Sequence, residues 1–79
     1  VDGRVSAGGG KLKVYVQYMF GSVARGKSDE VTFDAGSFSE KTLSFTIPKN
    51  INSTDLRIVL ETEAGTTAEV RKVEMYMWR

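Results

Sequence analysis

Cysteine and histidine are both missing from this sequence of 79 residues. Their absence excludes a disulfide framework and a metal site built from cysteine or histidine, which are the usual reinforcements of small domains. It also removes the commonest general base and the most reactive nucleophile of enzymes. The sequence therefore predicts a protein that is not an enzyme and that has no metal and no cofactor.

Long apolar runs and an excess of charge of one sign are missing as well. No stretch approaches the roughly 18 apolar residues of a membrane-spanning helix, and the first residues lack the apolar centre of a signal peptide, so we expect no membrane partner. The chain has 11 basic and 10 acidic residues, a net charge of +1. Because the two signs are interspersed along the chain, we expect no nucleic acid partner.

A chain of this length forms one domain and buries only about 60% of its unfolded surface, so its stability margin is small. Oligomerisation, or attachment to a longer chain, is the remaining reinforcement, and we expect a homo-oligomer or a part of a longer protein. The first residue is Val1 and not methionine, which favours an excised piece with any targeting signal outside it. Residues 1–10 are rich in glycine and predict a flexible linker before a domain at 11–79.

The sequence does contain a two-residue alternation of apolar side chains. It is clearest over residues 11–20, where every second residue from Leu12 to Phe20 is apolar, which is typical of a strand with one buried face. Shorter alternating runs predict further strands at 30–34, 38–47, 56–61 and 68–78. No stretch has the spacing of an amphipathic helix. We therefore expect an all-β fold, an antiparallel, jelly-roll-like β-sandwich of about five strands.

The last of these strands contains a change of phase. Val70 and Val73 lie on opposite parities, and a β-bulge near Arg71 and Lys72 would bring them to one face. The expected core gathers the inward positions of all five strands. It consists of Leu12, Val14, Val16, Tyr18, Phe20, Val31, Phe33, Leu43, Phe45, Ile47, Leu56, Ile58, Leu60, Val73 and Met75.

One motif matches a phosphate-binding loop. Residues 21–28, Gly-Ser-Val-Ala-Arg-Gly-Lys-Ser, follow the pattern GxxxxGK[ST] after a predicted strand. A phosphate loop needs a helix whose N-terminus points at the phosphate, whereas residues 29–36 alternate and then turn. We therefore interpret 21–28 as a hairpin loop with a chance match, with a nucleotide-binding fragment as the alternative. Arg25 and Lys27 keep the loop soluble in this interpretation, and contact with an anionic ligand or partner is their alternative role.

Aromatic and hydrogen-bonding side chains gather on the faces opposite the expected core. Tyrosine and tryptophan combine a flat apolar ring with a polar edge, which suits stacking on a sugar ring flanked by hydrogen-bonding groups. The same residue types also suit a protein interface. The candidate ligand-binding residues are Tyr15, Gln17, Arg57, Glu61, Tyr76 and Trp78.

Four segments together resemble a known family: Val-Tyr-Val-Gln-Tyr at 14–18, Lys-Thr-Leu-Ser-Phe-Thr-Ile-Pro at 41–48, Asp-Leu-Arg-Ile-Val-Leu at 55–60 and Val-Arg-Lys-Val-Glu-Met-Tyr at 70–76. Their succession resembles the later strands of jelly-roll carbohydrate-binding modules related to galactose-binding-like domains. The resemblance implies binding of carbohydrate. Such modules also occur as appended domains of bacteriophage fibres and cell-surface proteins, which implies an extracellular or virion-surface location.

Two functions follow from these observations. The first is a non-catalytic carbohydrate- or receptor-binding module of a larger surface or virion protein, which binds a surface glycan through the candidate residues. The alternative is a structural, self-assembling β-domain of a phage fibre, tail or capsid, in which the same residues are buried against a partner protein chain. The aromatic set favours the first function, and the small unreinforced core favours the second.

Overall fold

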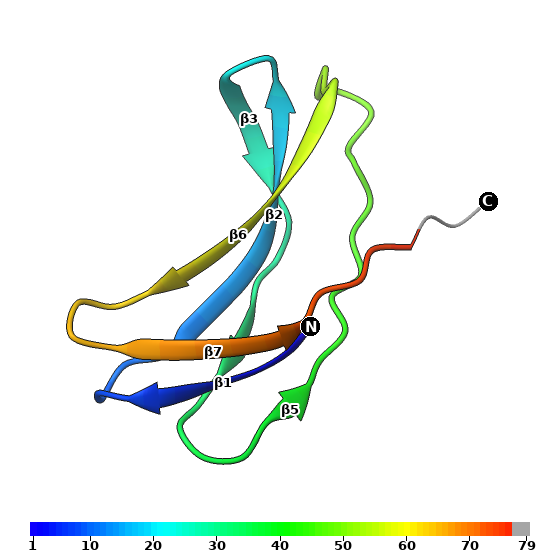
Figure 1. The fold of residues 1–79 in the computed structure, drawn as a ribbon. Helices are drawn as coiled ribbons and strands as arrows, with labels where there is room; N and C mark the ends of the chain where they lie inside the picture. Colours follow the sequence, from blue (N-terminus) through cyan, green and yellow to red (C-terminus); the bar gives the residue numbers. More distant parts are fainter. Residues whose placement is uncertain (77–79) are drawn as a thin grey trace.

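The computed structural model describes residues 1–76, which form seven strands and no helix (Figure 1). This confirms the all-β class, with two more strands than expected. The strands are β1 (Asp2–Ala7), β2 (Leu12–Phe20), β3 (Val23–Lys27), β4 (Val31–Phe33), β5 (Ser39–Glu40), β6 (Asp55–Thr62) and β7 (Thr67–Lys72).

The strands form two antiparallel sheets that pack as a small β-sandwich. In the four-stranded sheet, β2 is central: β6 pairs with one of its edges from Leu12 to Met19, while β4 and β3 share the other edge. The three-stranded sheet has the order β5-β1-β7. It crosses only one end of the longer sheet, so that β2 and β6 continue beyond it (Figure 1).

The core lies at the end where both sheets are present. Val5, Leu12, Val14 and Phe33 come from β1, β2 and β4, and none of them is more than 2% exposed. Val16 and Tyr18 are buried as well, which confirms the predicted inward face of β2. Tyr15 and Met19 on the other face are also buried, so this central strand is covered on both sides.

The predicted bulge is present in β7. Gly3 pairs with Val70 and Asp2 pairs with Lys72, so Arg71 is the extra residue. One bulged residue changes the phase of the strand, and Val70 packs against the core while Val73 lines the space next to it.

The expectation of a flexible linker at residues 1–10 is wrong, because β1 occupies Asp2–Ala7 in the middle of its sheet. The alternation of apolar side chains is weak in β1, because one of its inward positions is Gly3. A Cβ at this position would lie 3.2 Å from the carbonyl oxygen of Glu69. The expectation of a loop at 21–28 is also wrong. Residues Val23–Lys27 form β3, which pairs with the end of β2.

The strand expected at 38–47 is confirmed only at Ser39–Glu40. The strand expected at 68–78 ends at Lys72 within the described residues, and its last two residues lie outside them. The segments that follow Glu40 and Lys72 are unpaired, because both lie beyond the first residue of β1 and no described strand lies between them there.

The same gap explains the expected core residues that are exposed. A side chain on the inner face of a sheet stays exposed where the opposite sheet is missing. Six residues expected in the core are 38–45% exposed: Phe20, Ile47, Leu56, Leu60, Val73 and Met75. Val31, Leu43, Phe45 and Ile58 are half-buried.

Candidate functional site

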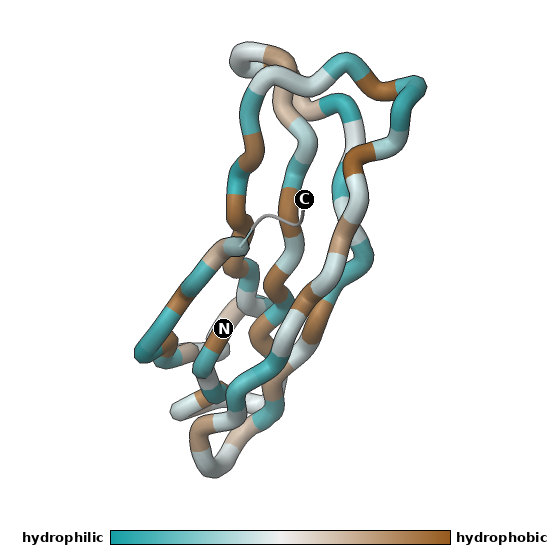
Figure 2. Tube along the Cα trace, turned by 90° about the vertical axis from the view of Figure 1, so that its right-hand side faces the viewer, coloured by the Kyte–Doolittle hydropathy of each residue, from teal (hydrophilic) through white to brown (hydrophobic). Residues whose placement is uncertain are grey.

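An apolar groove of about 620 Å³ lies beside the core, where the three-stranded sheet stops. Its floor is the inner face of β2 and β6, with Val14, Val16, Leu56 and Ile58. Figure 2 faces this side of the molecule and shows apolar positions alternating with polar ones along the chain. The sequence predicted these inward side chains but not the groove, because it placed a paired strand over them.

The two walls of the groove are the segments at 41–47 and 73–76. Leu43, Phe45 and Ile47 line one wall, and Val73 and Met75 line the other. From residue 42 to residue 47, and again from 73 to 76, no backbone N–H bonds to another described backbone group. Water can satisfy these groups in an open groove, and a strand of another chain could satisfy them equally well.

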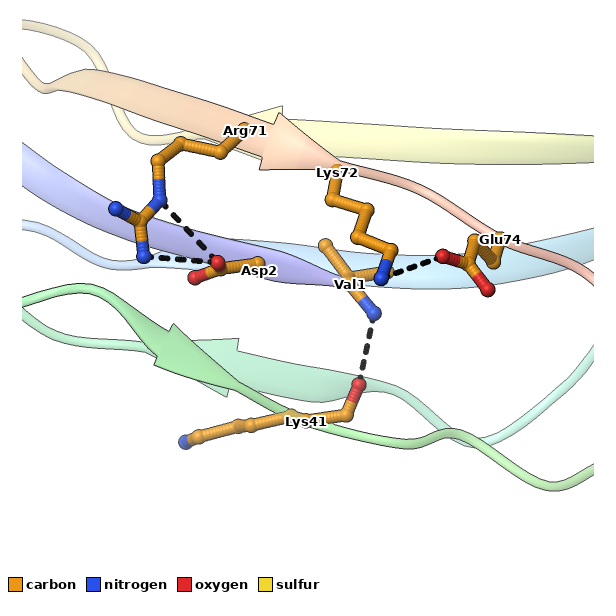
Figure 3. A network of polar contacts seen from close by, with 6 residues as sticks. All are labelled: Val1, Asp2, Lys41, Arg71, Lys72 and Glu74. Atoms are coloured by element: carbon orange, nitrogen blue, oxygen red, sulfur yellow. Dashed lines mark hydrogen bonds and ion pairs between the residues drawn. The ribbon is translucent and has the colours of Figure 1, made fainter.

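A polar network closes the end of the groove next to β1 (Figure 3). The nitrogen of Val1 donates to the carbonyl oxygen of Lys41 at 2.9 Å, and Lys72 lies 2.6 Å from the Glu74 carboxylate. Arg71 donates twice to one carboxylate oxygen of Asp2, at 3.2 and 2.9 Å. The bonds of Val1 and Asp2 join the start of β1 to the chain after β5 and to β7.

Lys41 links this network to the core. Its ammonium group lies 5.2 Å from the centre of the Phe33 ring and donates to the carbonyl oxygen of Thr32. A lysine can place its apolar stem over a core while its charge finds polar partners. Lys41 thereby covers the boundary between the core and the groove.

Four of the six candidate residues lie together on the outer face of the four-stranded sheet. Gln17 of β2 pairs with Arg57 of β6, and the Tyr15 hydroxyl donates to the Glu61 carboxylate at 3.3 Å. The Tyr15 ring does not lie open: the residue is 9% exposed, and the Lys27 ammonium group lies 4.7 Å from the ring centre. The pairing of these residues was predictable from strand parity, but the lysine over the ring was not.

Burial raises the pKa of the Tyr15 phenol above its ordinary value, and the charge and hydrogen bond of Glu61 raise the same pKa further. The neutral phenol is therefore favoured as the donor to Glu61. This arrangement stabilises the outer face and does not supply a group that would exchange protons near neutral pH.

The other two candidate residues do not join this face. Tyr76 is 74% exposed and lines the groove on the opposite side of the sheet. Trp78 lies outside the described residues. The structure thus separates the predicted set into an outer-face group and a groove residue.

The segment that matches a phosphate loop has a structural role. The Ser28 hydroxyl accepts a hydrogen bond from the Val16 amide at 3.0 Å and donates to the Asp29 carbonyl oxygen at 2.8 Å. Because the preceding residues form β3 and no helix follows, their amides do not converge on an anion. The segment is a strand and a buried anchor.

Other site types are not found among residues 1–76. No group of three or more acidic side chains is placed to hold a metal ion in this part of the chain. Over the same residues, no helix is long and apolar enough to cross a membrane. Comparisons with protein-family models, curated proteins and solved structures found no match to this chain.

Proposed function

We propose that this domain is a non-catalytic assembly module that binds a protein chain in the apolar groove. The observation that carries the proposal is an apolar floor between two segments whose backbone N–H groups have no described backbone partner. A sheet edge with free backbone groups pairs with an added strand, and pockets for alternate side chains give the pairing its specificity. This is the assembly function that the small core also favours.

Burial of the groove would strengthen a domain whose core is small. Leu56, Val73 and Met75 are each about 40% exposed (38, 42 and 43%) and line one continuous surface. Contiguous exposed apolar surface marks interaction sites in soluble proteins, and covering it contributes roughly 25 cal/mol per Å². A partner chain in the groove would therefore serve both binding and stability.

Binding of a surface glycan is the second candidate function, supported by the neighbouring polar groups of Gln17, Arg57 and Glu61 on the outer face. The geometry favours it less, because Lys27 covers one face of the Tyr15 ring that would stack on a sugar. A titration with a glycan array tests it directly. Binding that is lost in Tyr15→Ala and kept in Leu56→Glu would favour the glycan function over assembly.

Selection of displayed peptides tests the assembly function. The domain is immobilised at low density and presented with a library of random linear peptides. We expect enrichment of peptides with apolar residues at every second position, because an added strand turns alternate side chains toward the floor. A selection that yields no enriched peptides contradicts the proposal.

The control uses two exposed leucines of the same strand. Leu56 and Leu60 of β6 are 38% and 45% exposed, but only Leu56 lines the groove. Leu56→Glu should abolish binding of the selected peptides, whereas Leu60→Glu should leave it unchanged. Equal loss in both variants would mean that the peptides bind elsewhere.

A further inference from the structure

We propose that a second, polar pocket, between β3 and the loop at 48–54, binds a small carboxylate that carries neighbouring hydroxyl groups. The pocket has a volume of about 360 Å³ and is lined by Ala24, Arg25, Asn50, Ile51 and Asn52. It lies at the end of the four-stranded sheet that the three-stranded sheet does not cover (Figure 1). Among the described residues it shares no lining side chain with the apolar groove, so this inference stands apart from the proposed function.

A β-bulge places Arg25 at this pocket. Tyr18 pairs with Gly26 and Met19 pairs with Ala24, so Arg25 is the extra residue of β3. The extra residue of a bulge is left out of the ladder, and bulges often redirect a side chain next to a functional site. The bulge therefore accounts for the place of Arg25 at the pocket, outside the alternation of its strand.

The two cations of this hairpin have different surroundings. The Lys27 ammonium group lies 3.8 Å from the Glu30 carboxylate and 4.7 Å from the centre of the Tyr15 ring. Arg25 takes part in none of the ion pairs among residues 1–76, and its guanidinium carbon lies 5.9 Å from the centre of the Phe20 ring. The charge of Arg25 is therefore available to a ligand, whereas Lys27 has an acidic neighbour in the chain.

The opposite wall of the pocket belongs to a loop that is firmly attached to the sheet. The Thr54 amide donates to the carbonyl oxygen of Met19 at 2.8 Å, and the Ser53 hydroxyl donates to the same oxygen at 3.1 Å. Ile51 packs against β3 where Gly26 leaves room, since a Cβ on Gly26 would lie 2.9 Å from the Ile51 Cδ1. These contacts fix the loop before a ligand binds, which lowers the entropic cost of binding.

The polar side chains of the pocket determine what it can bind. Arg25 presents a planar fork of N–H donors that matches the two oxygens of a carboxylate. Asn50 and Asn52 are exposed, and each side-chain amide has both a donor and an acceptor. Hydroxyl groups can pair with both halves of such an amide, whereas phosphate oxygens act mainly as acceptors. A carboxylate flanked by hydroxyl groups therefore fits this set better than a phosphate does.

The size of the pocket limits the ligand. Its volume of about 360 Å³ is near the lower end of the roughly 300–1,000 Å³ of ligand pockets. Ala24 and the half-buried Ile51 supply a small apolar part of the wall, which can contact the C–H groups of a ligand. One acidic sugar residue of a glycan and a free hydroxy acid share this chemistry and this size.

A titration of the ¹⁵N-labelled 79-residue chain, followed by NMR, tests the site. Sodium glucuronate has a carboxylate and hydroxyl groups, whereas glucose has only the hydroxyl groups and sodium acetate only the carboxylate. We expect glucuronate to shift the amide signals of residues 24–25 and 50–52, and to bind about tenfold or more tightly than glucose, acetate or phosphate. Equal binding of acetate or phosphate would overturn the proposal, and so would the absence of these shifts with glucuronate.

Arg25→Met and Lys27→Met form a matched pair, because each removes one cation from β3. Arg25→Met should weaken glucuronate binding about tenfold or more, while Lys27→Met should leave it unchanged. Arg25→Lys keeps the charge but loses the fork, so it should weaken binding as well. Asn52→Asp alters the opposite wall without a change of size, and its negative charge should abolish binding. Equal effects of Arg25→Met and Lys27→Met would contradict the site.

Two further ligands identify the source of the carboxylate. Methyl glucuronoside has the closed ring of a sugar residue in a glycan, and gluconate is an open-chain hydroxy acid. Binding of either one at residues 24–25 and 50–52 supports the site, and the tighter of the two names the source. Leu56→Glu changes the groove and should leave glucuronate binding unchanged, so the failure of this site and the failure of the proposed assembly function are distinguishable.

Discussion

Val1 and Lys41 exchange two backbone hydrogen bonds, at 2.9 and 2.8 Å, and these are the last bonds between β1 and the chain that follows β5. Beyond this pair the three-stranded sheet opens, and Leu56 on the inner face of β6 stays 38% exposed. The apolar positions along 41–47 continue past this pair without a neighbouring described strand. The pair of Val1 and Lys41 therefore marks the boundary between the core and the groove.

Gly8 should tolerate no side chain. Its φ is +93°, and a Cβ would lie 2.4 Å from the Gly65 carbonyl oxygen and 2.8 Å from the Thr66 Cα. Since all of these are backbone atoms, Gly8→Ala should lower the free energy of unfolding by about 2 kcal/mol or more. Urea denaturation measures the loss.

Gly9 is the matched control for this prediction. It is the next residue, and a Cβ added there would meet nothing within 4 Å. Gly9→Ala should change the free energy of unfolding by no more than about 0.5 kcal/mol. Similar losses in the two variants would show that the turn between β1 and β2 does not approach the turn between β6 and β7.

Ser28→Ala should destabilise the fold through the Val16 amide. The hydroxyl accepts from this amide at 3.0 Å, and Ser28 is buried. A buried donor left without a partner costs about 1–3 kcal/mol, and the Val16 amide should exchange its hydrogen faster. Ser22→Ala, in the exposed turn before β3, should do neither. An unchanged exchange rate for Val16 would refute the anchoring role of Ser28.

Leu12→Ala should lower the free energy of unfolding much more than Leu60→Ala. Leu12 is 1% exposed within the core, whereas Leu60 is 45% exposed. Truncation of a buried leucine costs about 2–5 kcal/mol, which is a large part of the stability of a small domain. We expect Leu60→Ala to cost less than about 1 kcal/mol. Thermal unfolding followed by circular dichroism compares them, and equal losses would mean that Leu60 is buried in solution.

The Tyr15 phenol should titrate at a higher pH than an ordinary tyrosine. Burial raises its pKa most, and Glu61 raises it further. The folded state keeps the phenol proton where the unfolded state has lost it. The stability from the neutral phenol is therefore complete below pH 10 and is lost as the pH rises through the raised pKa. Tyrosinate absorbance measures this titration. Tyr15→Phe should remove the late step, and Glu61→Gln should move it toward lower pH.

If Glu61→Gln leaves the late step unchanged, the hydrogen bond between these two side chains does not form in solution. Because the chain contains three tyrosines in total, the comparison with Tyr15→Phe identifies the step that belongs to Tyr15. The measurement separates a buried phenol from one that is free to meet a ligand on the outer face.

The alternation in the sequence was sufficient to predict the all-β class, the central strand at 11–20 and the bulge at Arg71. A strand that is buried on its inner face must place apolar residues at every second position, so Leu12, Val14 and Val16 carry the signal themselves. The bulge was predictable because Val70 and Val73 could share a face only if one residue were added between them.

The strands β1 and β3 could not be recognised in this way. Their apolar positions are few, and Gly3 and Gly26 occupy places where a neighbouring strand or side chain leaves little room for a Cβ. The sequence does not distinguish a glycine that lets a neighbouring strand or side chain approach closely from a glycine that makes a loop flexible. The sequence therefore predicted a linker and a loop where the structure has paired strands.

Side-chain periodicity alone determined which residues of this protein turn inward, because the two-residue repeat of an extended chain depends only on local geometry. Whether an inward residue is buried was decided by the tertiary structure, since burial depends on a second sheet that lies far away in the sequence. Leu43, Phe45 and Met75 have the pattern of core residues, and they line a groove because no described strand lies between their two segments.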